Sequence, residues 1–317
     1  MFVQIILFIV GLTLVVFGAD YLVEGASAVA RKAGLSEFII GLTIVGMGTS
    51  APEMVVSFIG AAQGNADIAL GNVVGSNIYN TLLILGITAL LLPMAITREN
   101  RIKDIPMNIA ISVMLILLGM KHTFFGLGTD GLSRIDGGIL LAMFIAYMWY
   151  SFKTSSSEDN PQDSKPVSTL LAVGMIVGGI AALIFGGRFF VNSATSIAHA
   201  LGVSDKFIAI TILAGGTSLP ELATCVAAAV KKKGQLALGN IIGSNIFNVL
   251  LILGGSALIN PLSFADISLV DMGILLVSAL ALLTSCFIGK KNSLDRLDGV
   301  LFLLLWAGYM AWLILNL

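Results

Sequence analysis

Charged residues are scarce in this sequence. Only 11% of its 317 residues are Asp, Glu, Lys or Arg, whereas 57% are hydrophobic, and the mean hydropathy is +0.99. Because a soluble domain usually carries about 25% charged residues, this composition predicts a polytopic membrane protein that lies mostly within the lipid bilayer. The net charge of −1 leaves no basic surface for binding nucleic acid.

Cysteine and histidine are also rare. The two cysteines, Cys225 and Cys286, both lie in apolar runs and are expected to be small core residues, not a disulfide or a metal pair. No Ser/His, Asp/Asp or metalloprotease constellation is present, so we do not expect an enzyme. No bound cofactor or partner chain is implied, and we expect a monomer.

Long apolar runs account for most of the chain. A membrane-spanning helix needs about 20 apolar residues, and by that rule the sequence predicts an all-α fold with ten transmembrane helices. The predicted segments are 2–27, 38–62, 68–92, 104–120, 134–152, 167–194, 206–230, 235–259, 268–288 and 297–316.

A polar stretch at 153–166, rich in Ser, Asp and Pro, is predicted to be a cytoplasmic linker between two five-helix halves, 1–152 and 167–317. The halves are repeats. When the sequence is shifted by 168 residues, 27 of the 58 positions from Ser36 to Pro93 are identical to those from Ser204 to Pro261. Internal repeats of this kind are typical of secondary transporters.

The distribution of basic residues predicts the orientation. Lys and Arg gather in cytoplasmic loops. If both termini are outside, 13 of the 17 Lys and Arg residues lie in the segments on the cytoplasmic side. Lys231, Lys232 and Lys233 align with uncharged residues of the first half, as expected for repeats of opposite topology. We therefore predict two inverted repeats with the N- and C-termini outside the cell membrane.

One motif occurs at the same place in each half. Gly-Thr-Ser-x-Pro-Glu occupies 48–53 and 216–221, inside the second and seventh predicted helices. A charge at the bilayer centre costs roughly 2.5–3.5 kcal/mol on insertion scales, so two glutamates there indicate a function. Pro52 cannot donate to the carbonyl of Gly48, and the loosened backbone is expected to free the Gly46 carbonyl for a cation.

The third and eighth predicted helices add polar groups at helical spacing. Ser76 and Asn80 are four residues apart and share a face, as do Ser244 and Asn248. The neighbouring amides are read as packing groups that support the site: Asn72, Asn77, Asn240 and Asn245. The combined set contains only oxygen ligands, which suit hard cations such as Ca²⁺. Two glutamates balance either one divalent or two monovalent ions.

Together the two motifs, each followed by Gly-Asn-x-x-Gly-Ser-Asn-Ile, resemble the alpha repeats of the sodium/calcium exchanger family, within the cation/calcium antiporter superfamily. The resemblance covers nearly the whole chain. It implies a ten-helix antiporter that binds Na⁺ or Ca²⁺ in turn, extrudes calcium, and slides its first and sixth helices past the core. The implied metal ligands are Glu53, Glu221, Thr49 and Thr217. The other implied cation-binding positions are Ser50, Ser218, Ser76, Asn80, Ser244 and Asn248, with backbone carbonyls at Gly46 and Ala214.

The sequence departs from the family pattern at one position. Many members carry Asp where this chain has Asn248, which leaves the ion stoichiometry and a role for potassium or protons open. Proton/calcium relatives typically have Glu at the positions of Gly75 and Gly243, and its absence here favours sodium as the driving ion. The alternatives are a proton- or potassium-linked cation antiporter and an uncoupled cation channel.

Overall fold

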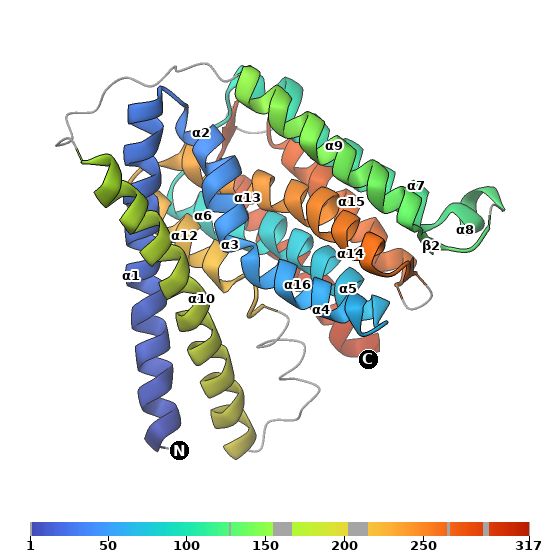
Figure 1. Ribbon diagram of the computed structural model, residues 1–317, viewed down its shortest axis with the longest axis horizontal. Coiled ribbons are helices and arrows are strands. Elements are labelled where there is room, and N and C mark those ends of the chain that lie inside the picture. The colour runs from blue at the N-terminus through green and yellow to red at the C-terminus, as the bar shows by residue number, and fades with distance from the viewer. Residues whose placement is uncertain are drawn as a thin grey trace.

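The computed structural model describes residues 2–126, 128–154, 167–201, 215–264, 267–287 and 292–316, and these are mostly helical (Figure 1). Helices are found in each predicted segment, although residues 206–214 of the seventh lie outside the described ranges, as do residues 155–166 of the predicted linker. The first and sixth predicted helices are longer at their C-terminal ends than predicted, reaching Ala33 and Ala200.

The first half of the chain contains three π-helical turns (η), two within helices and one at the start of a helix. In chain order, its elements are α1 (Phe2–Ala33), α2 (Glu37–Ile40), η1 (Gly41–Val45), α3 (Gly46–Thr49), α4 (Ala51–Ala62), α5 (Ala66–Ile78), η2 (Tyr79–Ile84), α6 (Leu85–Leu91), β1 (Met94–Ala95), η3 (Asn100–Asp104), α7 (Ile105–Gly119), α8 (Lys121–Phe125), β2 (Gly131–Leu132) and α9 (Arg134–Lys153).

The second half repeats much of this order. Its described elements are α10 (Thr169–Ala200), α12 (Leu219–Val230), α13 (Gly234–Phe247), η5 (Asn248–Leu253), α14 (Gly254–Ile259), β3 (Leu262–Ser263), α15 (Leu269–Thr284), β4 (Ser293–Leu294) and α16 (Arg296–Asn316).

Many of these helices are long and apolar enough to cross a membrane. Within the described ranges seven qualify, or eight if the pair Glu37–Thr49 and Ala51–Ala62, bent by 49°, counts as one span. Two shorter apolar helices, α12 and α15, add to these. The bend falls at Ser50, two residues before the proline that the sequence singles out, because Pro52 lies in the first turn of α4 and has no N–H to continue the preceding helix.

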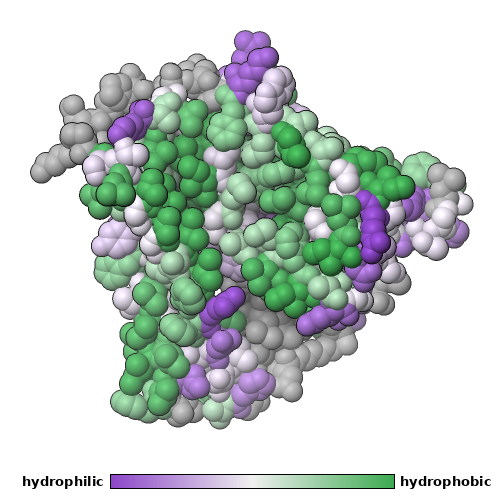
Figure 2. Space-filling model, in the orientation of Figure 1, coloured by the Kyte–Doolittle hydropathy of each residue, from purple (hydrophilic) through white to green (hydrophobic). Residues whose placement is uncertain are grey.

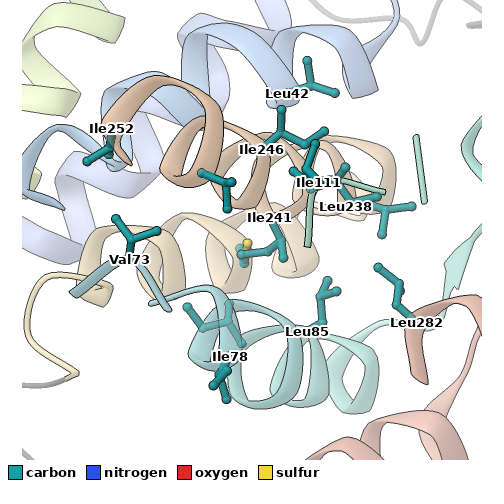
Figure 3. Packing of buried hydrophobic residues seen from close by; sticks show 14 of the residues in the cluster. Leu42, Val73, Ile78, Leu85, Ile111, Leu238, Ile241, Ile246, Ile252 and Leu282 are labelled. Atoms are coloured by element: carbon teal, nitrogen blue, oxygen red, sulfur yellow. The ribbon is translucent and has the colours of Figure 1, made fainter. Parts of the chain in front are cut away.

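The third and eighth predicted helices form the centre of the molecule. In α13–α14, 94% of the most apolar stretch is buried, and in α5–α6 78% is buried, against 22% in α1. Figure 3 shows residues of both central helices, Ile78 and Ile241 among them, in one apolar cluster with Leu42 of η1. On the face shown in Figure 2, hydrophobic residues cover most of the visible surface, and hydrophilic residues gather at the top, at the right and in the lower part. This pattern fits a protein that is surrounded by lipid.

The two longest helices, α1 and α10, lie side by side at one edge of the molecule (Figure 1). Gly11, Gly18 and Gly25 of α1, seven residues apart, face α10, and a Cβ added to Gly18 would lie 2.9 Å from the Gly179 carbonyl oxygen. A Cβ on Gly25 would lie 2.8 Å from the carbonyl oxygen of Ala172. Since later residues of α1 meet earlier residues of α10, the helices are antiparallel, and small residues allow their backbones to touch.

Four two-residue strands correct the all-α prediction. β1 pairs with β4, with Met94 opposite Leu294, and β2 pairs with β3, with Leu132 opposite Leu262; both pairs are antiparallel. Each pair joins one half of the chain to the other. The sequence did not predict them because two-residue strands carry no detectable periodicity.

Candidate cation-binding site

The two glutamates of the repeated motif are fully buried at equivalent places. Glu53 lies in the first turn of α4 and is 1% exposed, and Glu221 lies in the first turn of α12 and is 0% exposed. Each follows a proline that starts its helix. The N-terminal end of a helix stabilises a negative charge, so the local fold supports a carboxylate at both positions.

Serine hydroxyls join the two glutamates into one cluster. Ser50 of the first half donates a hydrogen bond of 2.9 Å to Glu221 Oε1. Ser218 of the second half donates to Glu53 Oε1 at 3.3 Å. Each serine lies three residues before the glutamate of its own half and bonds to the glutamate of the other half. The pairing is therefore reciprocal and brings both motifs to one place.

The threonines of the motif make a second reciprocal pair of contacts. Thr49 donates to Asn240 Oδ1 at 3.1 Å, and Thr217 donates to Asn72 Oδ1 at 3.3 Å. Asn72 also donates to the backbone oxygen of Glu53 at 3.1 Å. Thus each threonine is held by an asparagine from the other half, and these asparagines contact the predicted ligands directly.

The predicted positions on the third and eighth helices also reach the cluster. Ser76 donates to Glu53 Oε1 at 3.5 Å, and Ser244 donates to the Gly46 carbonyl oxygen at 3.5 Å. The same carbonyl accepts the Ser50 N–H at 3.0 Å. The Gly46 carbonyl is therefore not free of hydrogen bonds, contrary to the expectation from the sequence, although a carbonyl oxygen has a second lone pair. Ala214 lies outside the described residues.

Asn80 and Asn248 occupy π-helical turns, at the second residue of η2 and the first of η5. Both side chains are 1% exposed. Asn80 donates its amide nitrogen to Asn245 Oδ1 at 3.2 Å, and Asn248 donates to Asn77 Oδ1 at 2.9 Å. Single π-helical turns are common at functional sites because they alter the direction of side chains.

Within the part of the chain that the structure describes, four buried oxygens of the predicted ligand residues have no hydrogen-bond donor. They come in equivalent pairs from the two halves and are Glu53 Oε2, Glu221 Oε2, Asn80 Oδ1 and Asn248 Oδ1. Among the described residues, neither glutamate forms an ion pair with a basic side chain. A buried charge is normally paired or binds a metal ion, and carboxylate and amide oxygens are the ligands that hard cations prefer. The arrangement can thus hold a cation.

A cavity of about 390 Å³ adjoins the cluster at Ser218. One wall of the cavity is formed by Phe190 and Ala194 of α10. The opposite wall is formed by residues of the core elements η2, α12 and α16, namely Tyr79, Leu222 and Trp306. The equivalent face of α1 is closed, since Leu22 and Ala26 are 0% exposed. The two edge helices therefore pack differently against the core, and this cavity lies on the α10 side of the cluster.

Sequence reasoning treated the amides Asn77 and Asn245 only as packing groups. In the structure each accepts a hydrogen bond from an asparagine of the cluster that belongs to the other half. The signal was present, because Gly-Ser-Asn-Ile occurs twice and an amide at this depth needs a partner. Which partner each amide has depends on contacts between the halves, which spacing within one helix does not reveal.

Comparison with known proteins identifies the family of the chain. The family described as sodium/calcium exchanger protein matches residues 3–153 and 171–315. Sodium/calcium exchanger MaX1 of Methanosarcina acetivorans is 33% identical, covering 97% of this chain and 97% of its own length. Inner membrane protein YrbG of Escherichia coli K12 is 36% identical, covering 97% of this chain and 94% of its own length.

A solved structure of the sodium-calcium exchanger NCX_Mj matches the fold with a TM-score of 0.84 at 33% sequence identity. The match covers 98% of each chain. Family and fold therefore agree over almost the full length. The chain belongs to the sodium/calcium exchanger family and has the fold of a membrane exchanger.

Proposed function

We propose that this protein is a secondary active antiporter that exchanges Na⁺ for Ca²⁺ across the cell membrane and extrudes calcium. The observation that carries the proposal is the reciprocal pairing of Ser50 with Glu221 and of Ser218 with Glu53. It creates one buried cluster with two carboxylates and unpaired oxygens from both halves. Membership of the exchanger family supports the same substrates.

Charge balance explains how such a site exchanges its ions. Two buried glutamates neutralise one Ca²⁺ or two Na⁺, and either load satisfies the site. Holding both loads would leave a net positive charge in a medium of low dielectric constant, which is strongly unfavourable. Occupancy by one ion type therefore excludes the other, which is the minimum requirement for coupled exchange.

The proposed ligands are the positions implied by the family resemblance. Glu53 and Glu221 supply the charge, and Thr49 and Thr217 supply further metal ligands. Ser50, Ser218, Ser76 and Ser244 contribute hydroxyl oxygens, and Asn80 and Asn248 contribute amide oxygens. Gly46 contributes its backbone carbonyl, and Ala214 is proposed by equivalence with it. Calcium takes about 6–8 oxygen ligands in tolerant geometry, and this set is large enough to supply them.

For the architecture, we propose ten transmembrane helices in two inverted repeats, with both termini outside. Two observations support inversion. Helices α1 and α10, which occupy equivalent places in the halves, are antiparallel. The strand pairs β1–β4 and β2–β3 are also equivalent, because Met94-Ala95 aligns with Leu262-Ser263 under the shift of 168 residues.

Exchange requires access from alternate sides, and we propose that α1 and α10 move together against the other helices. The cavity between α10 and the core reaches Ser218, while α1 is closely packed. Lys231, at the end of α12, lies 2.6 Å from Asp20 Oδ1 and 2.8 Å from Glu24 Oε1. These ion pairs hold α1 to a core helix in this state and would break when α1 moves.

The experiment that tests the function is calcium flux into vesicles that contain the purified protein, with the membrane potential clamped. An outward sodium gradient should drive calcium uptake, and an outward proton or potassium gradient of equal size should not. Uptake driven by protons alone would assign the protein to the proton-linked alternative. Calcium flux that needs no counter-ion would indicate a channel.

A further inference from the structure

The amides of Asn80 and Asn248 each have two chemically different ends. The oxygen attracts a cation, whereas the NH₂ group is a donor and repels it. In both residues the oxygen is buried and has no hydrogen-bond partner among the residues that the structure describes. Something must hold each amide in this orientation, because a rotation of 180° about the last side-chain bond would exchange the two ends with almost no change in shape.

Asn77 provides this control for Asn248. The amide nitrogen of Asn77 donates 3.1 Å to the backbone carbonyl oxygen of Asn245. A backbone carbonyl can only accept, so the nitrogen of Asn77 must face it and the Asn77 oxygen must face the other way. That oxygen lies 2.9 Å from Asn248 Nδ2. Because an oxygen can only accept here, Asn248 must present its nitrogen to Asn77, and its oxygen must point away from Asn77.

The equivalent contact, between Asn80 and Asn245, is held in place by a different group. Asn245 accepts from Asn80 Nδ2 at 3.2 Å and donates its own nitrogen to Thr81 Oγ1 at 2.9 Å. A hydroxyl can donate as well as accept, so Thr81 constrains Asn245 less strictly than a backbone carbonyl constrains Asn77. The residue that aligns with Thr81 in the second half is Val249, and so the two anchors are not related by the repeat.

We propose that Asn77 is a positioning residue that sets the polarity of Asn248, so that an oxygen and not an NH₂ group faces the bound cation. This inference rests on the proposed function, since it assigns a cation ligand role to Asn248. All three side chains are buried: Asn77 is 2% exposed and Asn245 and Asn248 are each 1% exposed. Water therefore does not compete for these hydrogen bonds.

The test is a double-mutant cycle in which calcium binding to the purified protein is measured by calorimetry. Asn77→Leu keeps the side-chain size but removes both hydrogen bonds. We expect it to weaken calcium binding about 10- to 100-fold, the usual effect of removing a group that orients a metal ligand. In protein that already carries Asn248→Asp, Asn77→Leu should weaken calcium binding less than about threefold, because a carboxylate presents an oxygen in either orientation.

An equal loss of calcium affinity in both backgrounds would mean that Asn77 acts only through packing, and it would overturn the proposal. Unchanged calcium affinity when Asn77→Leu is made in the wild type would also overturn it. If Asn77→Leu does not fold, Asn77→Ala is compared in the same two backgrounds, with thermal unfolding as the control for integrity. A wild-type protein that binds neither Ca²⁺ nor Na⁺ would contradict the proposed function itself. Wild-type binding with no effect of either Asn77 variant would contradict only this inference.

Discussion

Ser50 donates a hydrogen bond of 2.9 Å to Glu221, a residue 171 positions later in the chain. The equivalent residues, Ser218 and Glu53, make the same contact in the other direction. Each half of the repeat therefore depends on the other to complete its surroundings. Neither half contains a full set of ligands, so the proposed site exists only where the two motifs meet.

Neutralising either glutamate should abolish exchange. Glu53→Gln and Glu221→Gln keep the shape of the side chain but leave a single negative charge, which cannot balance Ca²⁺. We expect calcium flux in vesicles to fall to the background rate, while the temperature of thermal unfolding stays the same or rises, because a buried unpaired charge is removed. Wild-type flux in both variants would remove these residues from the site.

Removing the hydroxyl of Ser50 or that of Ser218 should weaken calcium binding to a similar extent. A hydrogen bond to a charged group contributes roughly 1.5–3 kcal/mol, so Ser50→Ala and Ser218→Ala should each weaken binding about 10- to 100-fold. Ser112→Ala is the matched control, because that serine is also buried but donates to the backbone carbonyl of Asn108 in its own helix. A loss in the control equal to that in Ser50→Ala would argue against a specific role.

The close contact of α1 and α10 should be sensitive to one methyl group. A Cβ at Gly179 would lie 2.7 Å from the Gly18 carbonyl oxygen, so Gly179→Ala must separate the two helices. Overpacking of this kind costs about 1–3 kcal/mol, and we expect a lower unfolding temperature together with slower exchange. Gly178→Ala is the control, since a Cβ there meets no atom within 4 Å. Equal behaviour of the two variants would contradict the proposed packing.

Breaking the ion pairs of Lys231 should release α1 from the core. We expect Lys231→Gln to broaden the distance distribution between spin labels at Tyr21 and Val230, both of which are exposed. High salt should have the same effect on the wild type, because the paired carboxylates are about half exposed and are screened. Lys232→Gln serves as the neighbouring control. An unchanged distribution in Lys231→Gln would mean that these ion pairs do not restrain α1.

Much of the fold follows from the sequence because its signals are local. Apolar length predicted the helices, and the doubled Gly-Thr-Ser-x-Pro-Glu motif identified Glu53 and Glu221, because charge within an apolar helix is costly wherever it occurs. The four-residue spacing of Ser76 and Asn80 placed both residues on one side of their helix. Each of these arguments needs only one segment of chain.

What the sequence did not reveal depends on contacts between segments. The π-helical turns that contain Asn80 and Asn248 were not predicted, because no residue propensity marks them. The roles of Asn77 and Asn245 depend on which amide faces which across the two halves. The Gly46 carbonyl was expected to be free, but a serine from the other half bonds to it.

The central claim is that Na⁺ and Ca²⁺ occupy one site in turn. Equilibrium binding of radioactive calcium to the purified protein, titrated with sodium at constant ionic strength, tests it most directly. The account predicts that saturating sodium displaces all bound calcium and that Glu53→Gln or Glu221→Gln removes the binding altogether. Calcium that remains bound at saturating sodium would contradict it.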